Sequence, residues 1–135
     1  EAQGITVKEQ PYGYEVILPH LMPKRNHRNH TVFLLEPLTY ALKEFTVAHP
    51  ICRLEYALIW FIYEYTEDTP IHCIRDYDNI ETKEVLDIIN SFFLLDDGGA
   101  FCELHYSTRR GNRTCTRVII SSDIGLVSCQ KIKGN

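Results

Sequence analysis

The chain has 135 residues, of which 44% are apolar, and its formal net charge is −4. This length and composition exclude a disordered chain and predict one globular domain over residues 1–135. No apolar run reaches the ~18 residues that a membrane-spanning helix needs. The five cysteines show neither Cys-x-x-Cys spacing nor Cys/His ligand spacing. We therefore expect a cytoplasmic protein with reduced thiols and no membrane contact.

Charge is unevenly distributed along the chain. Residues 1–35 carry 4 basic and 3 acidic groups, residues 36–103 carry 4 and 14, and residues 104–135 carry 6 and 1. Carboxylates in the middle of the chain can hold cations and basic flanks can hold phosphate, so this distribution fits a metal-dependent site that acts on a phosphate-bearing substrate. The alternative is that the acids in the middle of the chain form a solvated surface.

The first elements that we predict are a strand and a polar loop. Residues 1–10 are expected to form a tail, and the alternation of residues 12–18 predicts a strand that Pro19 ends. Residues 24–30 then carry three fixed positive charges and two histidines. This segment is either a surface loop without a ligand or a loop that positions a DNA backbone. The candidate DNA-binding residues in it are Lys24, Arg25, Asn26, His27 and Arg28.

A helix and a central strand are expected next. Glu36-Pro37 predicts a helix start, because proline is favoured in the first helical turn. An apolar stripe with helical spacing follows and ends at His49-Pro50. The apolar run from Leu54 to Tyr65 predicts a central strand that is buried on at least part of both faces. Within this run, we expect Trp60 and Tyr63 to lie in the core or at a dimer surface. A role as a platform on which DNA bases stack is less favoured.

An acidic motif, Asp76-Tyr77-Asp78-Asn79, precedes the second predicted helix. Apolar residues at helical spacing run from Asn79 to Phe93, which predicts a helix of about 15 residues. A second acidic pair, Asp96-Asp97, follows this helix. The simplest alternative is structural, with an Asp or Asn capping the helix and Asp96-Asp97-Gly98-Gly99 forming a turn. The two acidic pairs meet only if the chain folds back after Phe93.

The last predicted unit is a β-hairpin. Residues 100–107 and 114–121 are its expected strands, residues 108–113 its tip, and residues 122–135 a tail. The arginines of the tip are either solvated or bind DNA phosphate, and the candidates are Arg109, Arg110 and Arg113, together with Arg75 beside the acidic motif. The whole pattern predicts an α+β fold in β-α-β-α-β-β order, with a mixed sheet of about four strands and two helices packed on it.

The acidic motif and the helix after it resemble the RusA family of Holliday-junction endonucleases. The residues that carry the resemblance are Asp76, Asp78, Asn79, Lys83, Leu86-Asp87, Asn90, Leu95 and Asp96-Asp97. A looser similarity extends over roughly residues 12–121. The family's lysine corresponds to Thr82 of this chain, and Lys83 lies one residue later, about 100° around a helix.

The resemblance implies a Mg²⁺-dependent endodeoxyribonuclease that acts as a homodimer on four-way DNA junctions in recombination and repair. Asp76, Asp78 and Asp97 would bind Mg²⁺ or Mn²⁺, with Asp96 as a neighbouring ligand and Asn79 as a helix cap or support. Lys83 is the candidate catalytic lysine. Carboxylates that leave water positions open allow the ion to activate water and to stabilise the leaving oxygen. The alternative is a protein of the same fold that has lost this activity and binds junctions or another protein.

Overall fold

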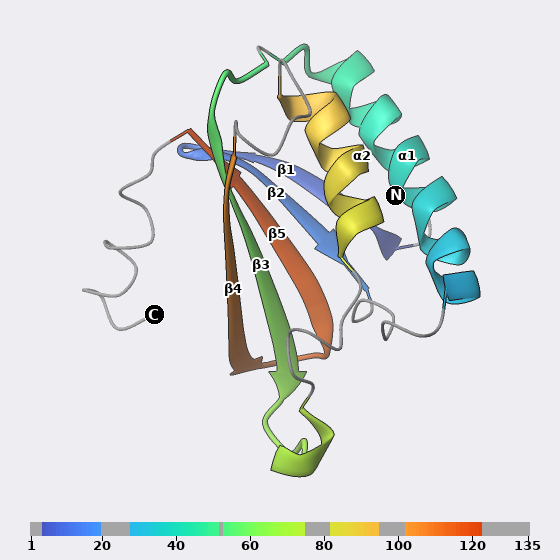
Figure 1. Cartoon of the computed structure of the whole chain (residues 1–135), viewed down its shortest axis with the longest axis vertical. Coiled ribbons are helices and arrows are strands. Elements are labelled where there is room, and N and C mark those ends of the chain that lie inside the picture. The colour runs from blue at the N-terminus through green and yellow to red at the C-terminus, as the bar shows by residue number, and fades with distance from the viewer. Residues whose placement is uncertain (1–3, 20–27, 52, 75–81, 95–101, 123–135) are drawn as a thin grey trace.

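A five-stranded mixed sheet carries two helices on one face (Figure 1). The computed structural model describes residues 4–19, 28–51, 53–74, 82–94 and 102–122, with the backbone alone at 28–33. The elements are β1 (Thr6–Gln10), β2 (Gly13–Leu18), α1 (Arg28–Ala48), β3 (Ala57–Thr66), the 3₁₀ helix η2 (Ile71–Cys73), α2 (Lys83–Phe93), β4 (Cys102–Gly111) and β5 (Cys115–Ser121). The α+β class predicted from the sequence is therefore confirmed. No helix among the described residues is long and apolar enough to cross a membrane.

The strands lie in the order β1-β2-β5-β3-β4, with β3 and β4 parallel and every other neighbouring pair antiparallel. The predicted hairpin of β4 and β5 is wrong, because β3 lies between these two strands. Their short connection therefore passes across the end of β3, where Thr66 is paired with Gly111. The physical reason is burial, since a strand that is apolar on both faces is best covered at the centre of a sheet.

Three other predicted boundaries differ from the structure. Residues 6–10, expected in the tail, form β1 and pair with β2. The first helix begins at Arg28 and not at Glu36, so Pro37 lies inside it. A proline removes its own N–H from the helix ladder, and packing on the sheet offsets that loss here. The second helix is shorter than expected and begins at Lys83.

The core lies between the sheet and the two helices. Alternate residues of β3, from Ala57 to Tyr65, face α1 and α2, and Phe61 is fully buried among them. Tyr14 of β2 contacts both helices, because its ring lies 5.9 Å from that of Phe45 and 4.8 Å from that of Phe93. The edge-to-face contact with Phe45 is a favourable aromatic geometry.

A smaller apolar cluster lies on the other face of the sheet, which we call the second face. Its buried members are Leu58, Trp60, Ile62 and Ile119, with Tyr12 packed against them. Trp60 donates its indole N–H to the Ser107 hydroxyl. Trp60 and Tyr63 are therefore both core residues, on opposite faces of β3.

Candidate functional site

The acidic residues of the predicted metal site lie outside the described residues, as do most of the predicted DNA contacts. This holds for Asp76, Asp78, Asn79, Asp96 and Asp97, and also for Lys24, Arg25, Asn26, His27 and Arg75. Arg28 is the first residue of α1, and its side chain is likewise outside the description. Among the described side chains, no three His, Cys, Asp or Glu residues group so that they could hold a metal ion. The structure does describe helix α2, which connects the two acidic segments.

Helix α2 joins the two acidic segments, and both of its ends are attached to the rest of the fold. At its start, the Thr82 hydroxyl lies 3.2 Å from the Tyr106 hydroxyl of β4. At its end, Leu94 forms an isolated parallel bridge with Leu54, just ahead of β3. Val85, Ile89 and Phe93 are buried against the sheet. Packing thus holds both ends of α2, where the two acidic segments connect to the described part of the fold.

Lys83, the candidate catalytic lysine, lies in the first turn of α2. Its Nζ is 3.2 Å from Asp87 Oδ2, one helical turn later, and the two side chains are 78% and 54% exposed. An exposed pair at this spacing contributes about 0.3–0.5 kcal/mol. The contact is thus too weak to hold Lys83 away from a ligand.

Two of the three arginines predicted at the hairpin tip contact β3 and the loop after it. Arg109 and Arg110 lie within β4 and not at a hairpin tip. Arg109 pairs with Glu64 of β3, and Arg110 Nη1 donates to the carbonyls of Thr66 and Thr69 at 2.9 and 2.6 Å. Arg113 is exposed in the β4–β5 connection. Arg113 also contacts the Cys115 side chain, and it is the one of these three arginines that lies in a connection and not in a strand.

Four charged side chains form a row across the second face of the sheet. In spatial order they are Glu15 on β2, Arg117 on β5, Glu64 on β3 and Arg109 on β4. Arg117 Nε lies 2.9 Å from Glu64 Oε1, and Arg117 Nη1 lies 3.3 Å from Glu15 Oε2. Arg109 Nε and Nη2 each lie 3.2 Å from Glu64 Oε1. This charge row alternates in sign over four neighbouring strands.

Glu64 is the most deeply buried member of the charge row, with a side chain that is 4% exposed. Burial by itself raises its pKa, but the hydrogen bonds and positive charges of Arg117 and Arg109 outweigh burial and lower the pKa below the usual value. Burial lowers the pKa of Arg117, and the hydrogen bond and charge of Glu64 more than reverse this. The side chains thus stay charged inside the fold because they are paired.

Gly111 explains how the Glu64 carboxylate fits beside β4. A Cβ at this position would lie 2.1 Å from Glu64 Oε2 and 2.4 Å from its Cδ. The absent side chain therefore leaves the space that the carboxylate occupies. Glycine is needed here for close approach and not for a left-handed backbone.

Asn90 brings a polar group into the core beneath α2. It is 2% exposed, and it is one of the residues that carry the resemblance. Burial raises the pKa of the Cys102 thiol on β4, and a hydrogen bond from Asn90 opposes that rise. Asn90 Oδ1 accepts no hydrogen bond in the described part of the chain. Such buried amide oxygens are uncommon in native proteins.

Comparison with known proteins assigns a family. A family model described as "Family of unknown function (DUF6100)" matches residues 1–124. The chain belongs to the DUF6100 family. No curated protein matches it significantly. Among solved structures, the periplasmic domain of Helicobacter pylori MotB is similar, with a TM-score of 0.46, 14% identity, and coverage of 96% of this chain and 89% of that one. At this TM-score the likeness carries no argument about function.

Sequence reasoning missed the charge row of the DUF6100 chain. Glu64 is the one charged residue in the run from Ala57 to Thr66, and an acid in so apolar a strand must find a cationic partner. That signal was available from the sequence. Its partners Arg109 and Arg117 were not identifiable in advance, since they depend on which strands flank β3 and in which register.

Proposed function

We propose that this DUF6100 chain is a Mg²⁺-dependent, structure-specific endonuclease that cleaves four-way DNA junctions. The observation that carries the proposal is the acidic pattern of the sequence, with Asp76, Asp78 and Asp97 as metal ligands and Asp96 beside them. Carboxylates in one site bind Mg²⁺ while leaving water positions open, as phosphodiester hydrolysis requires. Two such sites in a homodimer would match the two-fold symmetry of the junction.

The length of α2 is compatible with one shared site. Its 11 residues span about 16 Å at 1.5 Å per residue. Asp78 is four residues before Thr82, and Asp97 is three residues after Leu94. An extended chain covers at most ~3.3–3.6 Å per residue, so these two connections together can reach about 23–25 Å. That reach exceeds the helix, and the two acidic segments are therefore able to meet.

Lys83 would serve this site as a charge that stabilises the phosphate of the transition state. Its side chain is 78% exposed and is therefore accessible to a DNA phosphate. Arg113 would contact the DNA backbone from the β4–β5 connection. Arg109 and Arg110 would support the sheet instead of the DNA, since both guanidinium groups already bind to β3 or to the loop after it.

Cleavage of a synthetic four-way junction, labelled on each strand in turn, tests the proposal. We expect nicking in Mg²⁺ and none in EDTA, and a linear duplex of the same sequence should stay intact. Asp78→Asn should abolish nicking while junction binding survives. Glu84→Gln is the matched control, because Glu84 is an exposed acid of α2 outside the ligand set, and it should cleave normally. A wild-type protein that never nicks in Mg²⁺ or Mn²⁺ contradicts the proposal.

A second candidate function is binding of junctions or of another protein without cleavage. The contacts of Arg109 and Arg110 within the fold favour the protein-binding form of it, because they reduce the basic surface offered to DNA. Thermal unfolding with and without Mg²⁺ distinguishes the two candidates. A working carboxylate site is stabilised by its metal through mass action, whereas a capping and turn role of the same residues gives no shift.

A further inference from the structure

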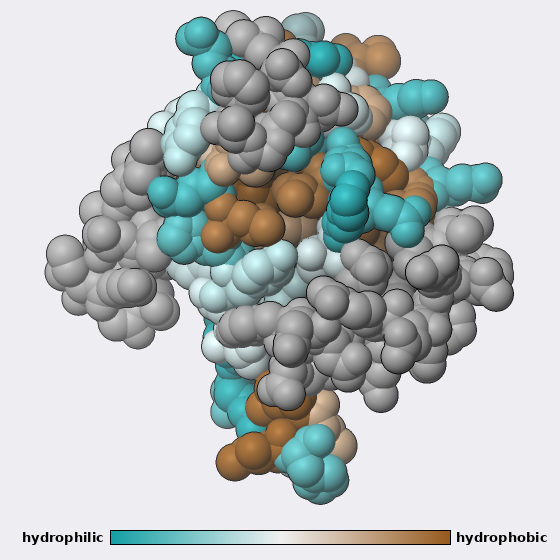
Figure 2. Space-filling model, in the orientation of Figure 1, coloured by the Kyte–Doolittle hydropathy of each residue, from teal (hydrophilic) through white to brown (hydrophobic). Residues whose placement is uncertain are grey.

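A projecting tip follows β3 at the end of the sheet remote from the helices' C-termini (Figure 1). It comprises residues 67–74 and includes η2. Ile71 at its centre is 81% exposed, and His72 and Cys73 beside it are also exposed. Figure 2 shows apolar surface on this projection. Ile71 is therefore accessible to another molecule, and the tip differs from other exposed apolar positions such as Val47 of α1 in that it projects from the fold.

The tip is held in shape by its own hydrogen bonds. Arg110 Nη1 reaches the carbonyls of Thr66 and Thr69. The Thr66 hydroxyl donates to Asp68 Oδ1 at 2.7 Å, and the backbone N–H groups of Cys73 and Ile74 close the 3₁₀ turn around Ile71. A preorganised projection loses little conformational entropy on binding. The exposed isoleucine is therefore presented on a fixed support.

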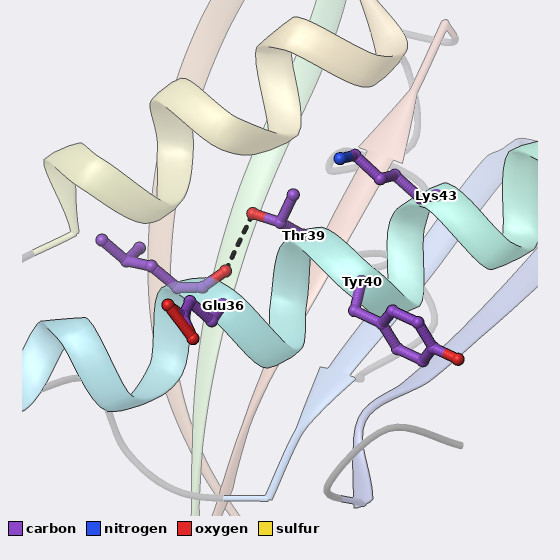
Figure 3. A pocket seen from close by; sticks show the side chains of 5 residues that line it. Glu36, Thr39, Tyr40 and Lys43 are labelled. Carbon is purple, nitrogen blue, oxygen red and sulfur yellow. Dashed lines mark hydrogen bonds between the residues drawn. The ribbon is translucent and has the colours of Figure 1, made fainter.

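A pocket on α1 has the complementary character. It has a volume of about 290 Å³ and is lined by Leu35, Glu36, Thr39, Tyr40 and Lys43. All five residues belong to one helix, so the pocket is an open hollow that a side chain of another molecule can enter. Glu36 lies near one end, and Tyr40 and Lys43 lie near the other (Figure 3). The pocket thus has an acid at one end and a base at the other.

We propose that the pocket on α1 of one molecule receives Ile71 from the tip of a second copy. Charge complementarity supports this occupant and sets its orientation. The exposed acid Glu67 precedes Ile71 and would face Lys43, whereas His72 follows Ile71 and would donate to Glu36. The tip projects from the sheet and not over α1, so it reaches the pocket of another molecule (Figure 1). This contact goes beyond the nuclease proposal and does not depend on it.

The two contacting patches are different, so the contact either closes reciprocally into a dimer or repeats head to tail. It is small, and we expect it to be weak and to depend on salt. Sedimentation velocity of the full chain from about 10 to 500 μM, at low and at high salt, measures it. Wild type should show a mass above the monomer that rises with concentration and falls with salt.

Substitutions in the tip and the pocket test the pairing. Ile71→Asp should weaken association at least tenfold, which is about 1.4 kcal/mol, whereas Ile71→Leu should retain it. Glu67→Lys and Lys43→Glu should each weaken association about fivefold, and the double variant should recover it. Glu84→Lys, the same charge change at an exposed site of α2, should have no effect. The proposal fails if wild type stays monomeric at 500 μM, or if it associates equally well with Ile71→Asp.

Discussion

Replacing Glu64 with glutamine tests whether the charge row stabilises the fold. Glutamine keeps the shape of the side chain but removes the negative charge to which Arg117 and Arg109 bind at 2.9 and 3.2 Å. Breaking a buried ion pair from one side costs about 3–5 kcal/mol. Arg109 is 47% exposed, so water partly replaces its lost partner, and we lower the estimate to about 2–4 kcal/mol.

The effect of this substitution should depend on pH. The pKa of Glu64 in the folded protein lies below the ordinary value of 4.5. The carboxylate therefore stabilises the fold above about pH 4.5, and this contribution is lost as the pH falls through the lowered pKa. Protonated glutamate resembles glutamine, so the free energies of unfolding of wild type and Glu64→Gln should converge at low pH.

Urea unfolding at pH 7, 5, 4 and 3 measures both expectations. Glu67→Gln is the matched control, because Glu67 is an exposed glutamate just beyond β3, and it should stay within about 0.5 kcal/mol of wild type. Our account of the charge row is refuted if Glu64→Gln unfolds within 0.5 kcal/mol of wild type at pH 7. It is equally refuted if a difference present at pH 7 is unchanged at pH 3.

Two further substitutions address neighbours of Glu64. Gly111→Ala should destabilise the fold by about 1–3 kcal/mol, because the new Cβ would meet a carboxylate that two arginines hold in place. Urea unfolding should show a smaller loss of stability when the same substitution is made in a Glu64→Ala background. An equal loss in both backgrounds would contradict the contact. Arg110→Met should cost about 1–2 kcal/mol and speed amide hydrogen exchange in the tip, because carbonyls of that loop lose their donor. Lys83→Met removes an exposed charge of α2 and should leave that exchange unchanged.

Local pattern was enough to predict much of the secondary structure. The apolar run that predicted a buried strand is β3, which starts three residues later than expected, and the apolar stripe near Leu38 does face the core. The start of α1 was missed because Pro37 suits a first turn by local preference alone. Packing on the sheet outweighed that preference and extended the helix back to Arg28.

The contacts of the arginines near the candidate site could be predicted less well from the sequence. The arginines near residue 110 were assigned to a hairpin tip, because strands adjacent in sequence usually pair. In the structure β3 separates β4 from β5, which brings Arg109 to Glu64 and Arg110 to the start of the projecting tip. The residue pattern within one segment does not show which distant strand will lie beside it in the sheet.

The sequence alone determined the α+β class and most of the apolar residues that are buried, because the spacing of apolar side chains reflects which side of a helix or strand leaves water. Tertiary structure alone decided the neighbours of β3, and with them the partners of its buried glutamate. Strand order and register are set by hydrogen bonds between segments far apart in the chain, and a charge excluded from water can only be matched once those segments have met.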